Sequence, residues 1–91
     1  MSETQEKLKK STKEGMNLAV TNRIKEIRTT QKHKQVDMAI AVGASTKTIS
    51  NIERGYYPPS LETALRLACY LKVPVEDLFQ LDEKTQELIQ N

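Results

Sequence analysis

The segment from Gln35 to Gly55 constrains the fold of this chain more than any other stretch. It contains two short stretches with helical periodicity, separated by Gly43-Ala44-Ser45. Glycine adopts at no steric cost the left-handed conformation that commonly ends a helix, and Gly43 directly follows the first stretch. Ser45 offers a side-chain oxygen to the free amides of the second stretch, as an N-cap does. The segment therefore predicts two helices joined by a sharp turn.

The second of these helices, residues 46–54, has two chemically different sides. Ile49 and Ile52 lie about one turn apart and must face a core. The opposite side is polar, carries no acid and consists of Lys47, Asn51 and Arg54, flanked by Thr48 and Ser50. A carboxylate on that side would repel phosphate, whereas hydrogen-bonding and basic side chains suit base edges. The pattern predicts a helix that enters the major groove of DNA.

The order of residues from Asn22 to Phe79 resembles the phage-repressor/Cro-like (XRE-type) helix-turn-helix family. The matching positions are Arg28, Gln35, Ala39, Gly43, Ser45, Thr48-Ile49-Ser50, Glu53-Arg54-Gly55, Pro59-Ser60-Leu61-Glu62-Thr63, Leu65 through Ala68, and Val75-Glu76-Asp77-Leu78-Phe79. The resemblance implies an all-α fold, a compact five-helix lambda-repressor-like DNA-binding domain. It also implies a sequence-specific double-stranded DNA-binding transcriptional regulator, a repressor, that binds a pseudo-palindromic operator as a homodimer.

The resemblance also implies roles for individual positions. The expected base contacts come from helix 46–54 and are Thr46, Lys47, Thr48, Ser50 and Asn51. The expected phosphate contacts are Gln35, Ser45, Arg54, Tyr56 and Tyr57. Arg28 and Glu53 are expected to form a structural ion pair, because Glu53 lies four residues after Ile49 and points sideways to the core.

Three features allow two interpretations each. Val36 and Ile40 form an apolar strip that either widens the core, which we expect, or makes an exposed contact patch. Cys69, the single cysteine, cannot form an intrachain disulfide and fits a reducing compartment. We expect its thiol to be packed and inert, with a redox sensor as the alternative. Of Tyr56 and Tyr57, we expect one to pack over the next helix and one to stay exposed.

The charge of the chain is distributed unevenly. The 91 residues carry a net charge of +2, which alone says little. Residues 23–54 contain seven Lys or Arg and three Asp or Glu, whereas residues 55–91 contain three basic and six acidic residues. The positive excess thus lies on the segment expected to face phosphate. A solvated mixed-charge surface is the plainer interpretation, but it does not predict this partition.

The chain length fits one domain with tails. We expect a flexible N-terminal arm over residues 1–19, an XRE-type helix-turn-helix domain over 20–80, and a C-terminal tail or short helix over 81–91. The expected first helix contains Val20, Ile24 and Ile27. The expected fourth helix is capped by Ser60 and turns Leu61, Ala64, Leu65, Ala68 and Leu71 to the core. The fifth starts with Pro74 and buries Val75, Leu78 and Phe79.

Other function classes find little support in the sequence. It contains no Ser/His/Asp set, no glycine-rich phosphate loop and no metal-ligand cluster, so we expect no enzyme, cofactor or metal site. His33 is expected to be a solvated loop residue. The lack of an apolar run of membrane-spanning length or a signal-peptide core predicts a cytoplasmic protein with no membrane partner. The alternative function is a protein-interaction or antitoxin-like module with secondary DNA binding, favoured by the Val36/Ile40 strip.

Overall fold

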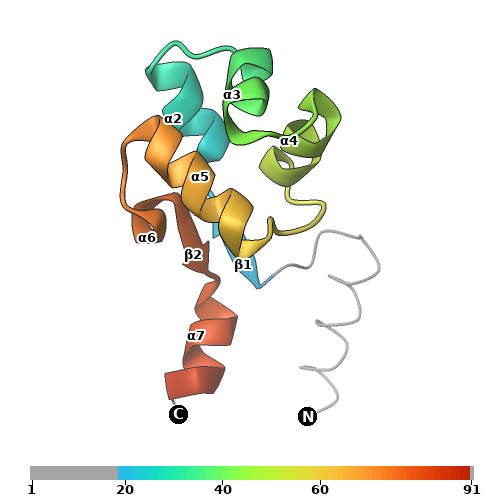
Figure 1. Cartoon of the computed structure of the whole chain (residues 1–91). Coiled ribbons are helices and arrows are strands. Elements are labelled where there is room, and N and C mark those ends of the chain that lie inside the picture. The colour runs from blue at the N-terminus through green and yellow to red at the C-terminus, as the bar shows by residue number, and fades with distance from the viewer. Residues whose placement is uncertain (1–18, 91) are drawn as a thin grey trace.

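The computed structural model describes residues 19–90, which form six helices and one small sheet (Figure 1). In chain order the elements are β1 (Val20–Asn22), α2 (Ile24–Thr30), α3 (Gln35–Val42), α4 (Thr46–Glu53), α5 (Leu61–Leu71), α6 (Val75–Leu78), β2 (Phe79–Leu81) and α7 (Glu83–Gln90). Apart from Ala19, the expected N-terminal arm lies outside the described residues. The all-α expectation is therefore wrong in one respect, the strand pair. The helix α7 lies in the segment 81–91, for which the sequence allowed a tail or a short helix. No helix among residues 19–90 is both long and apolar enough to cross a membrane.

The two strands pair the segment before α2 with the segment after α6. They pair antiparallel, with Val20 opposite Leu81 and Asn22 opposite Phe79. We expected Val20 to belong to the first helix, and this is wrong. That helix begins only at Ile24, whose N–H donates to the Asn22 Oδ1 (3.0 Å). In Figure 1 the sheet lies below α5, and α7 continues from β2 away from the other helices.

The core is built from the inward faces of α2 to α6. Its buried apolar residues are Ile24, Met38, Ala39, Val42, Ile49, Ile52, Ala64, Leu67, Ala68, Leu71 and Leu78. Full burial of one aliphatic side chain stabilises a fold by about 1.5–3 kcal/mol. Ile49 and Ile52 belong to this cluster, so the core holds α4 along its inner side.

The side of α5 that faces the core matches the predicted one only in part. Ala64, Ala68 and Leu71 are buried as expected, but Leu61 and Leu65 are 75% and 50% exposed. Leu67 is buried in their place. Since Leu67 lies three residues after Ala64 and four before Leu71, these three share one helical face. The helix is apolar on two sides, and packing against the other helices buries the side that contains Leu67.

Three further apolar or thiol side chains lie outside the core. Val36 and Ile40 are exposed, so the interpretation that they widen the core is wrong. The side of α3 that packs inward holds Met38 and Val42 instead. Cys69 is also exposed, which contradicts the expectation of a packed thiol. It lies two residues after Leu67 and two before Leu71, roughly on the opposite side of α5 from these buried residues, so it points to solvent.

Two smaller expectations also change. Pro74 is the N-cap of α6 rather than its first residue, and Phe79 belongs to β2. His33 is half-buried rather than simply solvated. Its ring centroid lies 4.8 Å from that of Tyr70, and its Nδ1 lies 3.4 Å from the Tyr70 hydroxyl oxygen. The loop between α2 and α3 is therefore attached to α5.

Candidate DNA-binding surface

The turn between α3 and α4 is fixed by two residues. Gly43 has φ 75° and ψ 31°, the left-handed conformation, and the Ala44 N–H donates to the Ala39 carbonyl (2.9 Å). Ser45 is extended, and its Oγ accepts from the Thr48 N–H (3.0 Å). Its hydroxyl in turn donates to the Thr48 Oγ1 (2.9 Å). The predicted helix end at Gly43 and the predicted cap at Ser45 are confirmed.

α4 is anchored on one side and open on the other. Ile49 and Ile52 are buried in the core. Thr46 and Lys47 are exposed. Thr48, Ser50 and Asn51 are half-buried. The first turn of α4 contains no acidic residue, so the positive end of the helix dipole is left unopposed there. The outer side of α4 thus presents amide, hydroxyl and ammonium groups.

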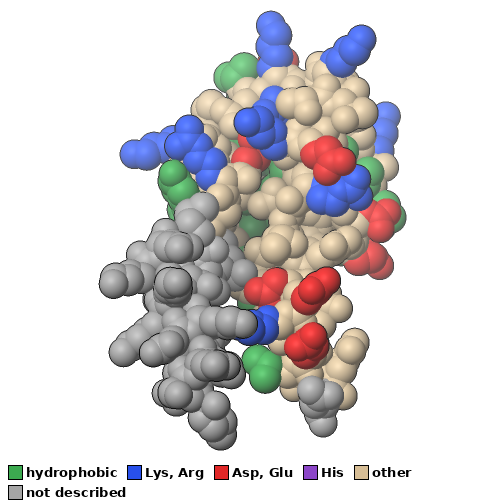
Figure 2. Space-filling model, turned by 180° about the vertical axis from the view of Figure 1, so that it is seen from behind, with side chains coloured by type: hydrophobic (Ala, Val, Ile, Leu, Met, Phe, Trp, Pro, Cys, Tyr) green, Lys and Arg blue, Asp and Glu red, His purple; other side chains and the backbone are tan. Residues whose placement is uncertain are grey.

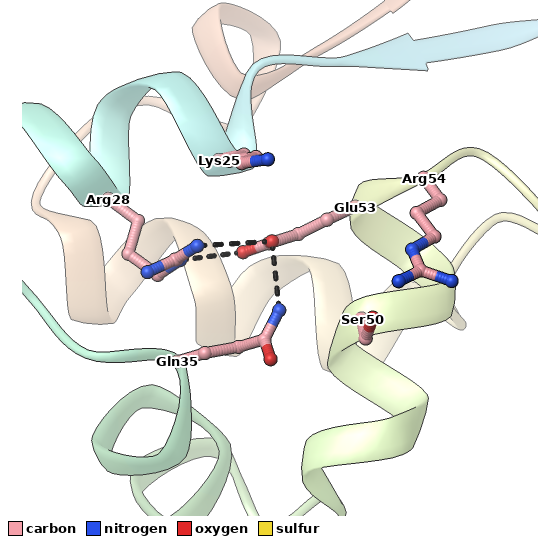
Figure 3. Close-up of a pocket in the computed structure, with 6 residues that line it drawn as sticks. All are labelled: Lys25, Arg28, Gln35, Ser50, Glu53 and Arg54. Atoms are coloured by element: carbon pink, nitrogen blue, oxygen red, sulfur yellow. Dashed lines mark hydrogen bonds and ion pairs between the residues drawn. The ribbon is translucent and has the colours of Figure 1, made fainter.

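A buried ionic network sets the position of α4 (Figure 3). The Arg28 Nε donates to the Glu53 Oε2 at 2.8 Å, and its Nη2 donates to the Oε1 at 3.3 Å. The Gln35 Nε2 donates to the same Oε1 at 3.0 Å. The Arg28 Nη1 donates to the His33 carbonyl at 3.1 Å. Since the side chains of Arg28 and Glu53 are only 11% and 3% exposed, the network that joins α2, α3 and α4 is largely shielded from water.

A second contact fixes the same C-terminal end of α4 to the sheet. The Asn22 Nδ2 donates to the Ile52 carbonyl at 2.9 Å, while its Oδ1 accepts from the first amide of α2. One asparagine side chain therefore links β1, α2 and the last turn of α4. No motif in the sequence pointed to the contact with α4, because the Ile52 carbonyl is a backbone group that only the fold brings close to Asn22.

A pocket of about 400 Å³ lies beside the ionic network. Its lining residues are Lys25, Arg28, Gln35, Ser50, Glu53 and Arg54. They come from α2, the first turn of α3 and the second half of α4 (Figure 3). Lys25 was not among the expected site residues. The only signal in the sequence that includes it is the positive excess of residues 23–54.

The loop after α4 carries the remaining expected phosphate contacts. Gly55 has φ 80°, which turns the chain away from the helix. The Arg54 guanidinium carbon lies 5.9 Å from the centroid of the Tyr56 ring, within cation–π range. Tyr56 and Tyr57 are 47% and 41% exposed. The expectation that one tyrosine packs over the next helix is therefore wrong.

The expected site residues are not all brought together. Gln35 and Arg54 line one pocket, and Tyr56 lies next to Arg54. Ser45 is at the opposite end of α4, where its hydroxyl is engaged in the helix cap.

On the face seen in Figure 2, most Lys and Arg side chains project from the upper part of the molecule, whereas the acidic ones lie mainly in its middle and lower part, toward α7.

Comparison with known proteins places this geometry in a family. A family model described as helix-turn-helix matches residues 24–78. An uncharacterised HTH-type transcriptional regulator of Methanocaldococcus jannaschii is 40% identical over 58 residues, covering 64% of this chain and 88% of that protein. A second one, YgzD of Bacillus subtilis, is 35% identical over 63 residues, covering 69% and 96%.

Among solved structures, the restriction-modification controller protein C.AhdI from Aeromonas hydrophila is similar, with a TM-score of 0.58 and 29% identity. The likeness covers 60% of this chain and 83% of that protein. The family model spans more than half of the chain, from α2 to α6. The chain therefore belongs to the XRE-type helix-turn-helix family, a family of DNA-binding transcriptional regulators.

Proposed function

We propose that this protein is a sequence-specific transcriptional repressor that inserts residues 46–54 into the major groove of a pseudo-palindromic DNA operator as a homodimer. The observation that carries the proposal is the architecture of α4. Its isoleucines lie in the core, its glutamate is held in a buried ion pair, and its remaining polar side chains face outward. The protein would act where the DNA is, in the cytoplasm. No catalysis and no cofactor are part of the proposal.

Base reading is assigned to the outer side of α4. Lys47 and Asn51 lie one helical turn apart on that side. Asparagine is suited to bidentate contact with adenine, and lysine to the acceptors of guanine. Thr46, Thr48 and Ser50 add hydroxyl groups that donate or accept hydrogen bonds. A small, polar side of this kind can approach base edges closely.

Phosphate contacts are assigned to residues at the edge of this side. Arg54 and Tyr56 form an exposed pair at the end of α4, and the Tyr57 hydroxyl follows. Gln35 uses one amide hydrogen for Glu53 and has a second one free to donate. Ser45 lies at the N-terminus of α4, where the backbone amides and the helix dipole also favour an anion.

We propose a dimer because one short helix can contact only a few base pairs. Two copies of α4 about 34 Å apart would contact successive major grooves on one side of the duplex. α7 leaves Leu88 and Ile89 exposed, which is apolar surface available to a second copy. Sedimentation of the free protein and of its DNA complex tests this point. A monomer in both would remove the dimer from the proposal.

Repression is the simplest regulatory outcome for a domain of this size. A small bound dimer occludes its operator and needs no further contact to block access. Reporter expression from a promoter that overlaps the operator should therefore fall when the protein is supplied. A rise in expression would replace repression by activation and leave DNA binding intact.

The direct experiment on the proposed function is selection of bound sequences from a pool of random duplexes. We expect enrichment of a pseudo-palindrome whose half-sites are centred about one helical turn apart. Recovery of unenriched sequence after several rounds would overturn sequence-specific binding. The experiment gives the operator, its symmetry and its spacing together.

A second candidate function is a protein-interaction or antitoxin-like module with secondary DNA binding. The observation that favours it is the exposed pair Val36 and Ile40 on α3. Such a module should bind DNA weakly, with little sequence preference, and gain stability from a protein partner. Replacing both residues by Gln should then abolish partner binding, whereas a DNA-binding repressor should keep its operator affinity.

A further inference from the structure

The Asn22 side chain makes two hydrogen bonds to the backbones of two different helices. Its Oδ1 accepts from the Ile24 N–H at 3.0 Å, and its Nδ2 donates to the Ile52 carbonyl at 2.9 Å. Asn22 is half-buried, so both bonds are partly shielded from water and gain strength from the lower local dielectric. The start of α2 and the last turn of α4 are therefore tied to one side chain.

The bond to α4 restricts its position and does not serve to pair a lone buried group. The Ile52 carbonyl also accepts from the Gly55 N–H at 3.0 Å, so it would keep a partner without Asn22. Hydrogen bonds are directional and weaken steeply when their angle is poor. Burial of Ile49 and Ile52 in the core is not directional in this way. The Asn22 amide therefore limits where the end of α4 can point.

The position of Asn22 depends in turn on the small sheet. Asn22 is the last residue of β1 and lies opposite Phe79 of β2. The next backbone hydrogen bond along this pair runs from the Arg23 N–H to the Leu78 carbonyl (2.9 Å). β2 follows α6 and lies outside the two helices of the helix-turn-helix. A shift of β1 relative to β2 would therefore move the amide that holds α4.

Base reading demands an accurately placed helix. A hydrogen bond spans about 2.7–3.2 Å between its heavy atoms, so a displacement of about 1 Å is enough to lose it. Asn51, an expected base contact, directly precedes Ile52. We propose that Asn22 is a positioning residue for base reading, which transmits the pairing of β1 with β2 to α4. The inference rests on the proposed function and adds to it a dependence on the sheet.

The Asn22→Asp variant removes the link to α4 and keeps the cap on α2. Aspartate offers the same acceptor to the Ile24 N–H, but its carboxylate has no hydrogen to donate to the Ile52 carbonyl. A negative charge is also unfavourable at the C-terminal end of a helix. The Asn22→Ala variant removes both bonds without adding charge. The two variants together separate the lost donor from the added charge.

Gln31→Glu is the matched control. The Gln31 Nε2 donates to the Leu71 carbonyl at 2.7 Å. This contact also joins a side-chain amide to the last turn of a helix, but the helix is α5, which is not expected to contact bases. The substitution removes the same kind of donor and adds the same charge. All three variants should lose stability, whereas only the two Asn22 variants should lose sequence preference.

The measured quantity is the ratio of the dissociation constants for a random duplex and for the selected operator. Both are measured on the full chain by fluorescence anisotropy, at a temperature where melts show each variant to be folded. A smaller folded fraction weakens both affinities by the same factor, so the ratio reports the placement of α4 and not its stability. We expect the ratio to fall about 5-fold or more in both Asn22 variants, the equivalent of one lost base contact.

Gln31→Glu should keep the wild-type ratio. An unchanged ratio in the Asn22 variants, or an equal fall in Gln31→Glu, would overturn the role of Asn22. A fall in Asn22→Asp without one in Asn22→Ala would assign the effect to the added charge and would overturn it as well.

A double-mutant cycle tests whether the sheet acts through Asn22. Gln80→Pro weakens β2, because proline has no N–H to donate to a paired strand, and Gln80 is exposed, so no core contact is lost. It should lower the ratio in the wild-type background and add nothing in Asn22→Asp, where the link is already absent. Additive losses, or no loss in the wild-type background, would overturn the coupling. If Gln80→Pro fails to fold, Gln80→Gly weakens the strand more mildly and replaces it in the cycle.

Failure of this inference is distinguishable from failure of the proposed function. If wild type shows no preference for a selected operator, sequence-specific binding is refuted whatever the variants do. If wild type shows the preference and both Asn22 variants keep it, base reading stands and only the positioning role of Asn22 is refuted.

Discussion

Replacement of Arg28 by Met tests how the ionic network supports α4. Methionine keeps the aliphatic part of the side chain and removes the guanidinium, which donates two hydrogen bonds to Glu53 and one to the His33 carbonyl. The Glu53 carboxylate, 3% exposed, would keep only the Gln35 amide as a partner. A buried carboxylate without its cation is strongly destabilising.

The magnitude follows from burial. Breaking a buried pair by removing one partner costs about 3–5 kcal/mol, and the 11% exposure of Arg28 points to the lower end. We expect Arg28→Met to lower the free energy of unfolding by about 3 kcal/mol. For a domain of this length that corresponds to a melting temperature about 12–24 °C lower. Since small domains are stable by about 5–15 kcal/mol, the variant should still fold at low temperature.

The assay is urea unfolding followed by circular dichroism, on Arg28→Met, Glu53→Met and the double variant. Replacing both partners removes the uncompensated charge, so the double variant should lie within about 1.5 kcal/mol of wild type. The interaction free energy from the cycle should then be at least about 2 kcal/mol. If Arg28→Met lost less than about 1 kcal/mol, or if the two single losses simply added, the network would not hold α4 as argued.

Three other changes have defined outcomes. Gly43→Ala should cost about 1–2 kcal/mol in urea unfolding, because φ 75° is disfavoured for a residue with a Cβ; no loss would mean that the turn relaxes. Ser45→Ala and Ser60→Ala each remove a helix cap and should each cost about 1 kcal/mol, but only Ser45→Ala should weaken DNA binding in anisotropy titrations. Asp82 precedes α7, and its Oδ1 accepts from the Thr85 N–H (2.7 Å) as a helix cap. The hydrogen bonds from the Thr85 hydroxyl and N–H lower the pKa of Asp82. The cap on α7 is therefore complete above the ordinary pKa of an aspartate and is lost as pH falls through the lowered one, so ellipticity should decrease at acid pH in wild type and not in Asp82→Ala.

Local signals were read correctly from the sequence. Gly43 and Ser45 act on their own backbone neighbours, so their roles depend on nothing distant. The Ile49/Ile52 spacing was equally informative, because α4 is apolar on one side only. Such features depend only on residues within one helix and at its ends, and the periodicity of apolar residues and the capping residues predict them from the sequence.

Features that join distant segments were missed. β1 forms only because Val20–Asn22 meets Phe79–Leu81 at the other end of the domain, and three residues give no periodic pattern. α5 is apolar on two sides, so only its neighbours decide that Leu67 faces inward and Leu65 outward. Lys25 lines the pocket because the fold brings α2 and the second half of α4 to its two sides. These outcomes depend on tertiary packing.

The most direct measurement for the whole account is the preference for operator over random duplex in Asn51→Ala and Lys47→Ala, with Gln90→Ala on α7 as control. Each lost base contact is worth about 1–3 kcal/mol, so the ratio of the two dissociation constants should fall about 5- to 150-fold while random-duplex affinity changes little. Gln90→Ala should keep the wild-type ratio. A preserved ratio in both α4 variants would contradict the claim that the outward side of this helix reads bases.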